Sequence, residues 1–213
     1  MYNVYDKLKK YRIVPVIAID DPDKALPLAD ALIEGGLPLI EITFRTSAAA
    51  EVIARLRRER TDLLVGAGTV LTRDDLKSAI DNGALFGVAP GFNPKIIEEA
   101  LKNNFPFMPG IMTPSDIEAG LALGIQTFKF FPAEAAGGIK YLTSIAAPYL
   151  HKKIKFVPTG GVNITNLRDY LSIDSVMAVG GTWIAKSDDL KSGNWEKIRS
   201  NCRAALNKIQ TPV

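Results

Sequence analysis

One lysine, Lys129, lies in the apolar stretch FKFFPAE, which covers residues 128–134. An ammonium group that leaves water for apolar surroundings loses free energy unless it is paired or gives up its charge. Loss of hydration lowers the pKa of an amine toward the range in which the free base exists near neutrality. A free amine attacks carbonyl carbons, and the protonated Schiff base that forms withdraws electrons from the neighbouring carbon. The position therefore indicates a nucleophile for cleaving a carbon–carbon bond beside a ketone, with a lysine reaching from a strand end to water as the structural alternative.

A partner acid lies in the motif EITFRT, residues 41–46, where Glu41, Thr43 and Arg45 alternate with apolar residues. Alternate residues of a strand share one face, so these three polar side chains are expected to line the same surface. Glu41 can exchange protons near Lys129, or it can form a buried structural ion pair with Lys129 or Arg45, and the sequence leaves both open. Arg45 is a candidate clamp for a substrate carboxylate, with a surface salt bridge as its alternative.

The segments that position these residues alternate between β-rich and helical patterns. Eight runs have the composition of strands: 13–19, 39–44, 63–68, 85–89, 105–108, 127–131, 155–158 and 176–179. Their spacing, roughly 20 to 28 residues, is typical of β/α units. The expected fold class is α/β, a closed (β/α)8 TIM barrel in one domain over 1–213, with an extra helix over 4–11. An open doubly wound sheet is the alternative.

Helix ends support this assignment. Thr72, followed by Asp75 and later by Gly83, has the spacing of a capped helix with a glycine stop. Thr113 and Asn93, each followed by a proline, predict two further helix starts.

In a closed barrel the second and sixth strands contribute to the same side-chain layers, so Glu41 and Lys129 are expected to face each other. Lys129 and Phe131 then point inward, while Phe128 and Phe130 pack under helices. The glycine-rich segments PTGG, 158–161, and VGGTW, 179–183, are expected as turns after the last two strands. Barrels of this kind bind phosphate there through backbone N–H groups. The GAGT segment contains a lone G-x-G and predicts no cofactor site.

Composition excludes several classes of function. The net charge is +3 and the arginine-rich run 55–60 is interleaved with glutamates, so we expect no nucleic-acid surface. Cys202 and His151 are the sole residues of their types, which leaves no material for disulfides, cysteine metal clusters or histidine triads. We expect Cys202 to be a packing residue and His151 to face solvent. No signal peptide or membrane span is predicted, and a soluble, cytoplasmic protein is expected.

Taken together, the motifs VPVIAI, EITFRT, GAGTVL, VAPG, MPGIMTP, FKFFPAE, PTGG and GGTW resemble, in order, those of the class I aldolases of the KDPG/KHG family. KDPG is 2-keto-3-deoxy-6-phosphogluconate and KHG is 2-keto-4-hydroxyglutarate. The resemblance implies a TIM barrel assembled as a homotrimer, with no metal and no organic cofactor. It also implies retro-aldol cleavage of a phosphorylated 2-keto acid to pyruvate and glyceraldehyde 3-phosphate, as in the Entner–Doudoroff pathway.

The same resemblance assigns roles to individual residues. Lys129 is similar to the Schiff-base lysine and Glu41 to the acid/base residue that acts through a water. The substrate carboxylate is implied to contact Arg45, Thr69 and Thr159. The pocket wall is implied to include Pro90 and Phe131, and the phosphate-binding positions are Gly160, Gly161, Gly181 and Thr182.

Two positions depart from the family's common pattern. The last motif is commonly GGSW and the fourth commonly SPG or TPG, where this chain has Thr182 and Ala89. Two other functions stay open from the residues alone. One is a phosphosugar isomerase or epimerase with Glu41 as base, and the other is a barrel that binds phosphorylated metabolites without turnover.

Overall fold

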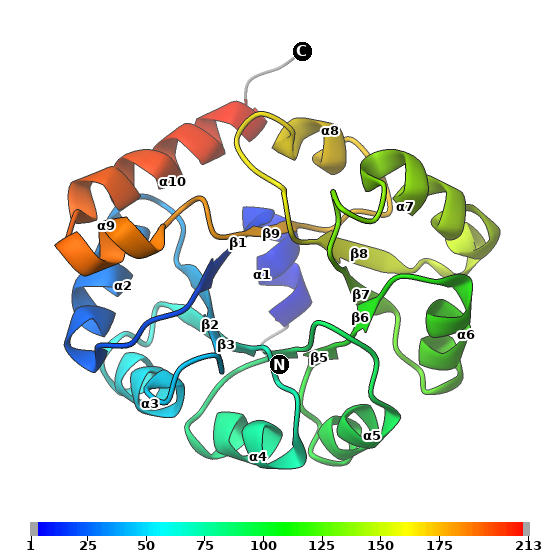
Figure 1. The fold of residues 1–213 in the computed structure, drawn as a ribbon, viewed down its shortest axis with the longest axis horizontal. Coiled ribbons are helices and arrows are strands. Elements are labelled where there is room, and N and C mark those ends of the chain that lie inside the picture. Colours follow the sequence, from blue (N-terminus) through cyan, green and yellow to red (C-terminus); the bar gives the residue numbers. More distant parts are fainter. Residues whose placement is uncertain (1–3, 211–213) are drawn as a thin grey trace.

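Short strands and amphipathic helices alternate along residues 4–210, the part of the chain that the computed structural model describes. The strands are β1 (Ile13–Ile17), β2 (Leu39–Thr43), β3 (Leu64–Gly68), β4 (Gly87–Val88), β5 (Phe107–Met108), β6 (Gly110–Ile111), β7 (Thr127–Phe130), β8 (Lys155–Pro158) and β9 (Val179–Gly181). The α-helices are α1 (Val4–Tyr11), α2 (Ala25–Glu34), α3 (Ala49–Glu59), α4 (Arg73–Asp81), α5 (Pro94–Lys102), α6 (Pro114–Ala122), α7 (Gly138–Ala146), α8 (Leu167–Leu171), α9 (Ser187–Ser192) and α10 (Trp195–Gln210). Two 3-10 helices, η1 (Pro22–Lys24) and η2 (Ala147–Lys152), complete the chain, and Figure 1 shows helices arranged around the strands.

The strands pair in parallel and follow chain order. One sheet has the order β5-β4-β3-β2-β1-β9 and the other the order β6-β7-β8. Two isolated parallel bridges, Phe156 with Val176 and Thr159 with Gly180, join the β8 segment to the β9 segment. The expected α/β architecture with parallel strands is therefore confirmed.

Of the eight predicted strands only 155–158 has the expected bounds, and residues 4–210 form nine strands in place of eight. The fifth run, expected over 105–108, is reduced to Phe107–Met108, and after Pro109 an unpredicted strand, β6, follows. At this proline, which offers no N–H group to a ladder, the pairing changes from β5 with β4 to β6 with β7. The last strand was expected over 176–179 but covers Val179–Gly181, so the prediction that both glycines lie in a turn is wrong. Glycine usually weakens a strand, and here it is required because the side chains of Thr159 and Trp183 occupy the space of a Cβ at Gly180 and Gly181.

The predicted helix starts are confirmed, because they depend on local chemistry. Thr72 accepts a hydrogen bond from the backbone of Asp75 in a capping box, and Thr113 does the same with Asp116. Asn93 caps α5 by accepting from the N–H of Lys95. The exposed His151 lies in η2, and the buried Cys202 lies on α10.

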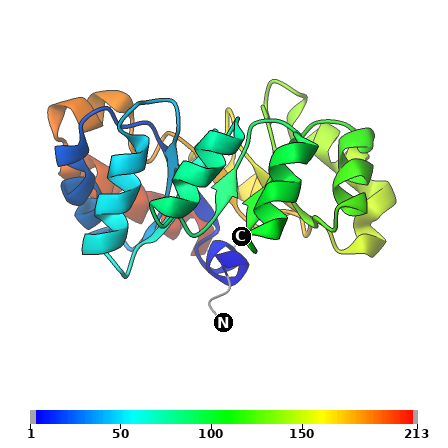
Figure 2. The same ribbon diagram turned by 90° about the horizontal axis from the view of Figure 1, so that it is seen from below.

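The space enclosed by the strands is apolar at their amino ends and is covered there by α1. Val4 and Leu8 of α1 belong to one cluster of buried residues with inward-facing residues of the strand segments: Val14, Leu39, Leu64, Phe86, Val88, Met108, Val157 and Ala178. Figure 1 shows α1 inside the ring of helices, and Figure 2 shows that it projects from one face of this ring. The helix therefore keeps water out of the amino end of the interior.

Leu8→Ala tests this covering role. Leu8 is fully buried, and truncating a buried leucine costs about 2–5 kcal/mol of unfolding free energy. We expect a loss in that range by urea denaturation. Lys9→Ala, at an exposed position of the same helix, is the control and should change the free energy by less than about 0.5 kcal/mol. Equal stabilities for the two variants would show that α1 does not seal the interior.

Candidate active site

Lys129 on β7 and Glu41 on β2 lie in contact with each other. The Lys129 Nζ lies 3.5 Å from Glu41 Oε1, and the two side chains are only 6% and 4% exposed. This distance exceeds the usual N–H···O range of about 2.7–3.2 Å, so the contact is an ion pair and not a tight hydrogen bond. The amine also lies 5.4 Å from the centroid of the Phe131 ring. The prediction that β2 and β7 bring these two residues together is confirmed.

The alternation of β7 produces this placement. Phe128 and Phe130 point the other way, are fully buried, and pack against Phe156 and Tyr141 at ring-centroid distances of 6.2 Å. Burying these two aromatic rings on one face of β7 places the side chain of the residue between them on the opposite face, toward Glu41. Hydrophobic packing thus holds the amine where hydration is poor.

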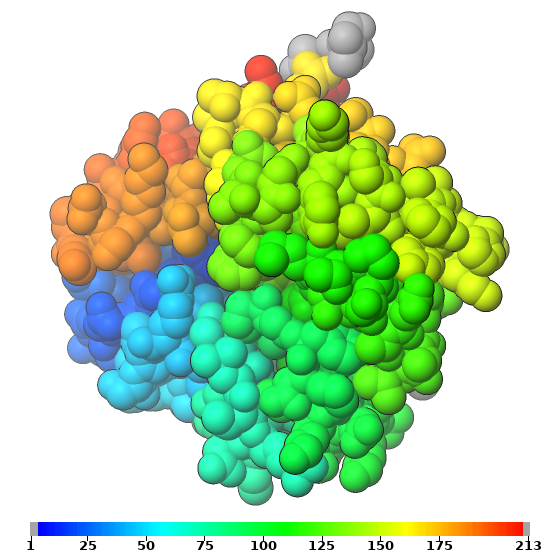
Figure 3. Space-filling model, turned by 45° about the vertical axis from the view of Figure 1, so that its right-hand side comes forward, coloured from blue at the N-terminus to red at the C-terminus, as the bar shows by residue number. Residues whose placement is uncertain are grey.

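A cavity of about 250 Å³ opens beside the Lys129 amine. Of the predicted site residues, only Glu41 does not line this cavity. The residues that line it together with Lys129 are Arg45, Thr69, Pro90, Phe131, Thr159, Gly160, Gly161, Gly181 and Thr182. Glu41 reaches the cavity through its contact with Lys129. Segments from the early part of the chain, blue to cyan, and from its later part, green to yellow, meet on one face of the molecule (Figure 3). Strand ends that are remote in sequence thus build one pocket.

Arg45 is held by a short chain of hydrogen bonds. The Thr43 hydroxyl donates to the carbonyl of Ile17 at 3.1 Å, and the Arg45 Nε donates to the Thr43 hydroxyl oxygen at 3.2 Å. The sequence analysis assigned no site role to Thr43. Its place on the same strand face as Glu41 and Arg45 in EITFRT was the signal that could have indicated one. Val16 and Val162 also line the cavity and carried no such signal.

Thr69 adopts an unusual backbone conformation at the cavity wall. Its φ is +56°, in the left-handed region that β-branched residues rarely occupy. Residues in such conformations cluster at functional sites, where the surrounding structure maintains them. Thr69, directly after β3, thus lines the pocket in a strained backbone conformation.

The turn after β8 presents backbone donors to the cavity. Gly160 and Gly161 have φ values of +96° and +85°, which side chains other than hydrogen rarely permit. Within residues 4–210 the N–H groups of Gly160, Gly161 and Thr182 donate to no protein acceptor. Successive free N–H groups of this kind form an anion-binding nest. Of the two predicted glycine turns, only this one is a turn; Gly181 contributes from the end of β9.

Gly68, at the end of β3, makes room for the acid. A Cβ at Gly68 would lie 2.1 Å from Glu41 Oε1 and 2.7 Å from the Glu41 Cδ. The lone G-x-G pattern of GAGT predicted no cofactor site, and this contact gives it a packing role. A glycine inside a strand often marks such a close approach, which was the signal in the sequence.

The comparisons with known proteins agree with this geometry. The family model described as KDPG and KHG aldolase matches residues 4–201. The chain belongs to this aldolase family. It is 44% identical over 207 residues to the 2-dehydro-3-deoxy-phosphogluconate aldolase of Haemophilus influenzae, covering 97% of each chain. The resemblance drawn from the motifs is confirmed.

Two solved structures of KDPG aldolases have the same fold. The Legionella pneumophila enzyme, with pyruvate captured at low pH as a covalent carbinolamine intermediate, has a TM-score of 0.91 and 37% identity, covering 96% of this chain and 98% of its own. The Zymomonas mobilis ZM4 enzyme with 3-phosphoglycerate has a TM-score of 0.86 and 35% identity, covering 95% of each chain.

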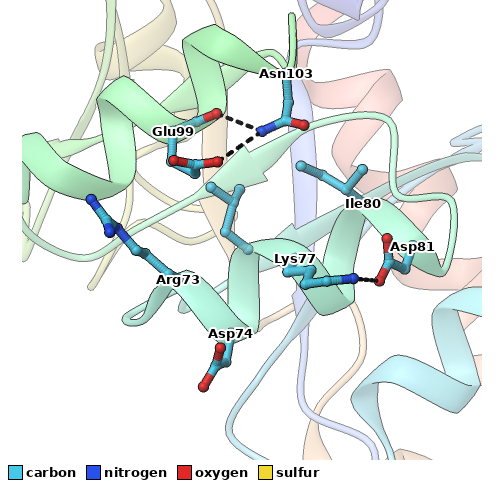
Figure 4. Close-up of a pocket in the computed structure, with 8 residues that line it drawn as sticks. Arg73, Asp74, Lys77, Ile80, Asp81, Glu99 and Asn103 are labelled. Atoms are coloured by element: carbon cyan, nitrogen blue, oxygen red, sulfur yellow. Dashed lines mark hydrogen bonds and ion pairs between the residues drawn. The ribbon is translucent and has the colours of Figure 1, made fainter.

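A second hollow in this aldolase, of about 390 Å³, lies between α4 and α5. Two pairs of its side chains bond locally, Lys77 with Asp81 and Glu99 with Asn103, as Figure 4 shows. Glu99 is half-buried and the other three are exposed, and the two pairs do not converge on a common point as the groups around Lys129 do. The hollow is therefore not a candidate site.

Cys202 is buried, as expected of a packing residue. Burial raises the pKa of the Cys202 thiol to about 12, so it packs as an apolar residue and is not a nucleophile. No group of three or more His, Cys, Asp or Glu side chains among residues 4–210 is arranged around a possible metal ion. Over the same residues, none of the helices is both long enough and apolar enough to span a bilayer. That the reaction of this protein uses no metal and no organic cofactor stays a prediction.

Proposed function

We propose that this protein is a class I aldolase that cleaves 2-keto-3-deoxy-6-phosphogluconate to pyruvate and glyceraldehyde 3-phosphate through a Schiff base on Lys129. The observation that carries the proposal is a buried amine beside a carboxylate, at the wall of a cavity with an anion-binding turn. The family description also supports cleavage of 2-keto-4-hydroxyglutarate to pyruvate and glyoxylate.

The reaction begins with covalent capture of the ketone. The Lys129 ammonium first gives a proton to the Glu41 carboxylate, and the free amine then attacks C2 of the substrate. As the C–N bond forms, the carbonyl π bond breaks and a proton passes from the nitrogen to the oxygen, which gives the neutral carbinolamine. Glu41, acting through a water, protonates the departing hydroxyl, which leaves as water and generates the iminium ion. The 3.5 Å separation of Lys129 Nζ and Glu41 Oε1 supports this assignment, because proton transfer needs contact or one intervening water.

Cleavage follows from the electron demand of the iminium. The Glu41 carboxylate accepts the C4 hydroxyl proton, the C3–C4 bond breaks, and its electron pair passes to C3 as the enamine forms. The aldehyde product leaves, C3 takes a proton, and water hydrolyses the iminium to release pyruvate and the free amine. Each proton taken up in one half of the cycle is returned in the other.

The cavity divides into subsites for the two ends of the substrate. We assign the substrate carboxylate to Arg45, Thr69 and Thr159, since the Arg45 fork suits a carboxylate. We assign the phosphate to the nest of Gly160 and Gly161, with Gly181 and Thr182 opposite. Pro90 and Phe131 also line the cavity, and we assign them to its wall.

The proposal extends to the whole molecule. We propose a closed (β/α)8 barrel with α1 as an added helix. The pairing of the first strand, β1, with the last, β9, supports closure and argues against an open doubly wound sheet. A single domain is supported by one cluster of buried residues that runs from Ile13 to Ala205. The family resemblance supports a cytoplasmic homotrimer that acts in the Entner–Doudoroff pathway.

Trapping with pyruvate and sodium borohydride tests the reaction. Borohydride reduces the protonated Schiff base to a secondary amine, so we expect one stable pyruvyl adduct, located on Lys129 by peptide mass mapping. The other lysines are internal controls and should stay unmodified. An isomerase or epimerase with Glu41 as base forms no adduct, and neither does a protein that only binds phosphorylated metabolites. A folded protein without an adduct on Lys129 contradicts the proposal.

A further inference from the structure

A hydrogen bond between the side chains of Tyr170 and Glu134 lies next to the glycine turn, Gly160 and Gly161. Glu134 follows β7 in the FKFFPAE segment, and its carboxylate accepts a hydrogen bond from the hydroxyl of Tyr170 on α8. Tyr170 is fully buried and is among the largest fully buried side chains of residues 4–210. The bond therefore ties the loop after β7 to the helix that follows the glycine turn.

Glu134 also touches the turn itself. Its backbone N–H donates to the carbonyl of Gly160 at 3.0 Å. Its Cβ and Cγ lie 2.5 Å from the position that a Cβ on Gly161 would take, so its side chain lies directly against this glycine. The neighbouring Ala133 N–H donates to the carbonyl of Thr159 at 2.8 Å. The turn thus rests on the segment that carries Glu134.

The carbonyl groups of the turn are held by hydrogen bonds from the surrounding protein. The carbonyl of Gly160 accepts from the backbone N–H of Glu134, and the carbonyl of Gly161 accepts from the side-chain amides of Asn163 at 3.0 Å and Asn166 at 3.3 Å. The carbonyls of Thr159 and Gly160 share peptide planes with the N–H groups of Gly160 and Gly161, so the bonds from Ala133 and Glu134 to these carbonyls fix the direction of both nest N–H groups. The affinity of a nest for an anion depends on that direction.

The hydrogen bond from Tyr170 also fixes the position of the negative charge on the Glu134 carboxylate. A carboxylate that turned toward the nest would repel a phosphate, and the Tyr170 hydroxyl holds it toward α8. Burial of the ring, together with the carboxylate acceptor, raises the pKa of Tyr170 well above its usual range, so the hydroxyl stays a donor at neutral pH. No function assigned above uses either residue.

We propose that Glu134 and Tyr170 are positioning residues of the phosphate subsite, which set the affinity for the phosphorylated end of the substrate and leave the Schiff-base chemistry unchanged. The inference rests on the proposed function for the identity of the substrate. It concerns anion binding by the turn, which can be measured without turnover.

Tyr170→Phe removes only the hydroxyl and is the main test. We expect the KM for 2-keto-3-deoxy-6-phosphogluconate and the Kd for 3-phosphoglycerate, by calorimetry, to rise about threefold to tenfold. The pyruvate concentration for half-maximal borohydride trapping should stay within about twofold of wild type, since pyruvate carries no phosphate. Tyr149→Phe is the matched control, because the Tyr149 hydroxyl donates to Glu118 at 2.7 Å on the exterior.

Two substitutions of Glu134 separate its role in positioning the turn from the effect of its negative charge on the phosphate. Glu134→Ala should reproduce the Tyr170→Phe effect, while Glu134→Gln keeps an acceptor for Tyr170 and should bind phosphorylated ligands at least as well as wild type. Unchanged Kd values in Tyr170→Phe, or equal losses for pyruvate and phosphorylated ligands, would overturn the inference. Failure of the proposed function would be seen separately, as a wild-type protein that forms no pyruvyl adduct.

Discussion

Lys129→Met is expected to abolish cleavage, with kcat lower by about 10⁴-fold or more, because no other group in the cavity can form the Schiff base. Methionine has a length close to that of lysine but carries no nucleophilic nitrogen. The borohydride adduct should disappear as well. The measurement is steady-state cleavage of 2-keto-3-deoxy-6-phosphogluconate on folded protein.

The stability of this variant needs its own control. Lys129→Met leaves the Glu41 carboxylate buried without its partner, and breaking a buried ion pair costs about 3–5 kcal/mol. The double variant Lys129→Met/Glu41→Gln removes that charge and should recover much of the stability while staying inactive. Lys155→Met, on neighbouring β8, alters a lysine that donates to the carbonyl of Asp174 and should retain wild-type kcat. Wild-type cleavage by folded Lys129→Met would exclude the Schiff-base assignment.

Gly68→Ala is expected to inactivate the enzyme through one added methyl group. The new Cβ would lie 2.1 Å from Glu41 Oε1, so the carboxylate must move away from Lys129. A misplaced acid/base group costs about 10²- to 10³-fold in kcat. The variant Glu41→Gln removes the acid directly and should lose activity by at least as much.

Gly66→Ala is the matched control, two residues earlier on the same face of β3. Its Cβ would meet the ring of Phe86 at 2.2 Å, in the apolar cluster away from the amine. We expect this variant to lose about 1–3 kcal/mol of stability by overpacking, with kcat per folded molecule retained. If Gly68→Ala is as active as Gly66→Ala, then Glu41 does not need its observed position.

Much of the scaffold could be read from local patterns. The capping box of α4 and the start of α6 at Thr113 depend on residues close together in the chain, and both were predicted at the right positions. The inward directions of Glu41 and Lys129 follow from strand alternation, which is a property of single strands. Strand bounds near prolines and glycines were less certain, as at Pro109 and β9, because ladder partners there are chosen across the sheet.

What the amino-acid order alone could establish was an α/β chain with one poorly hydrated amine, one acid of matching parity, and motifs of a known aldolase family. The folded chain alone decided why Gly68 must be glycine, how Thr43 holds Arg45, and that Tyr170 is bonded to Glu134. Contacts such as those of Gly68 and Tyr170 join segments that lie far apart in sequence. They depend on the positions of packed elements to within a few tenths of an ångström, which periodicity and capping rules do not specify.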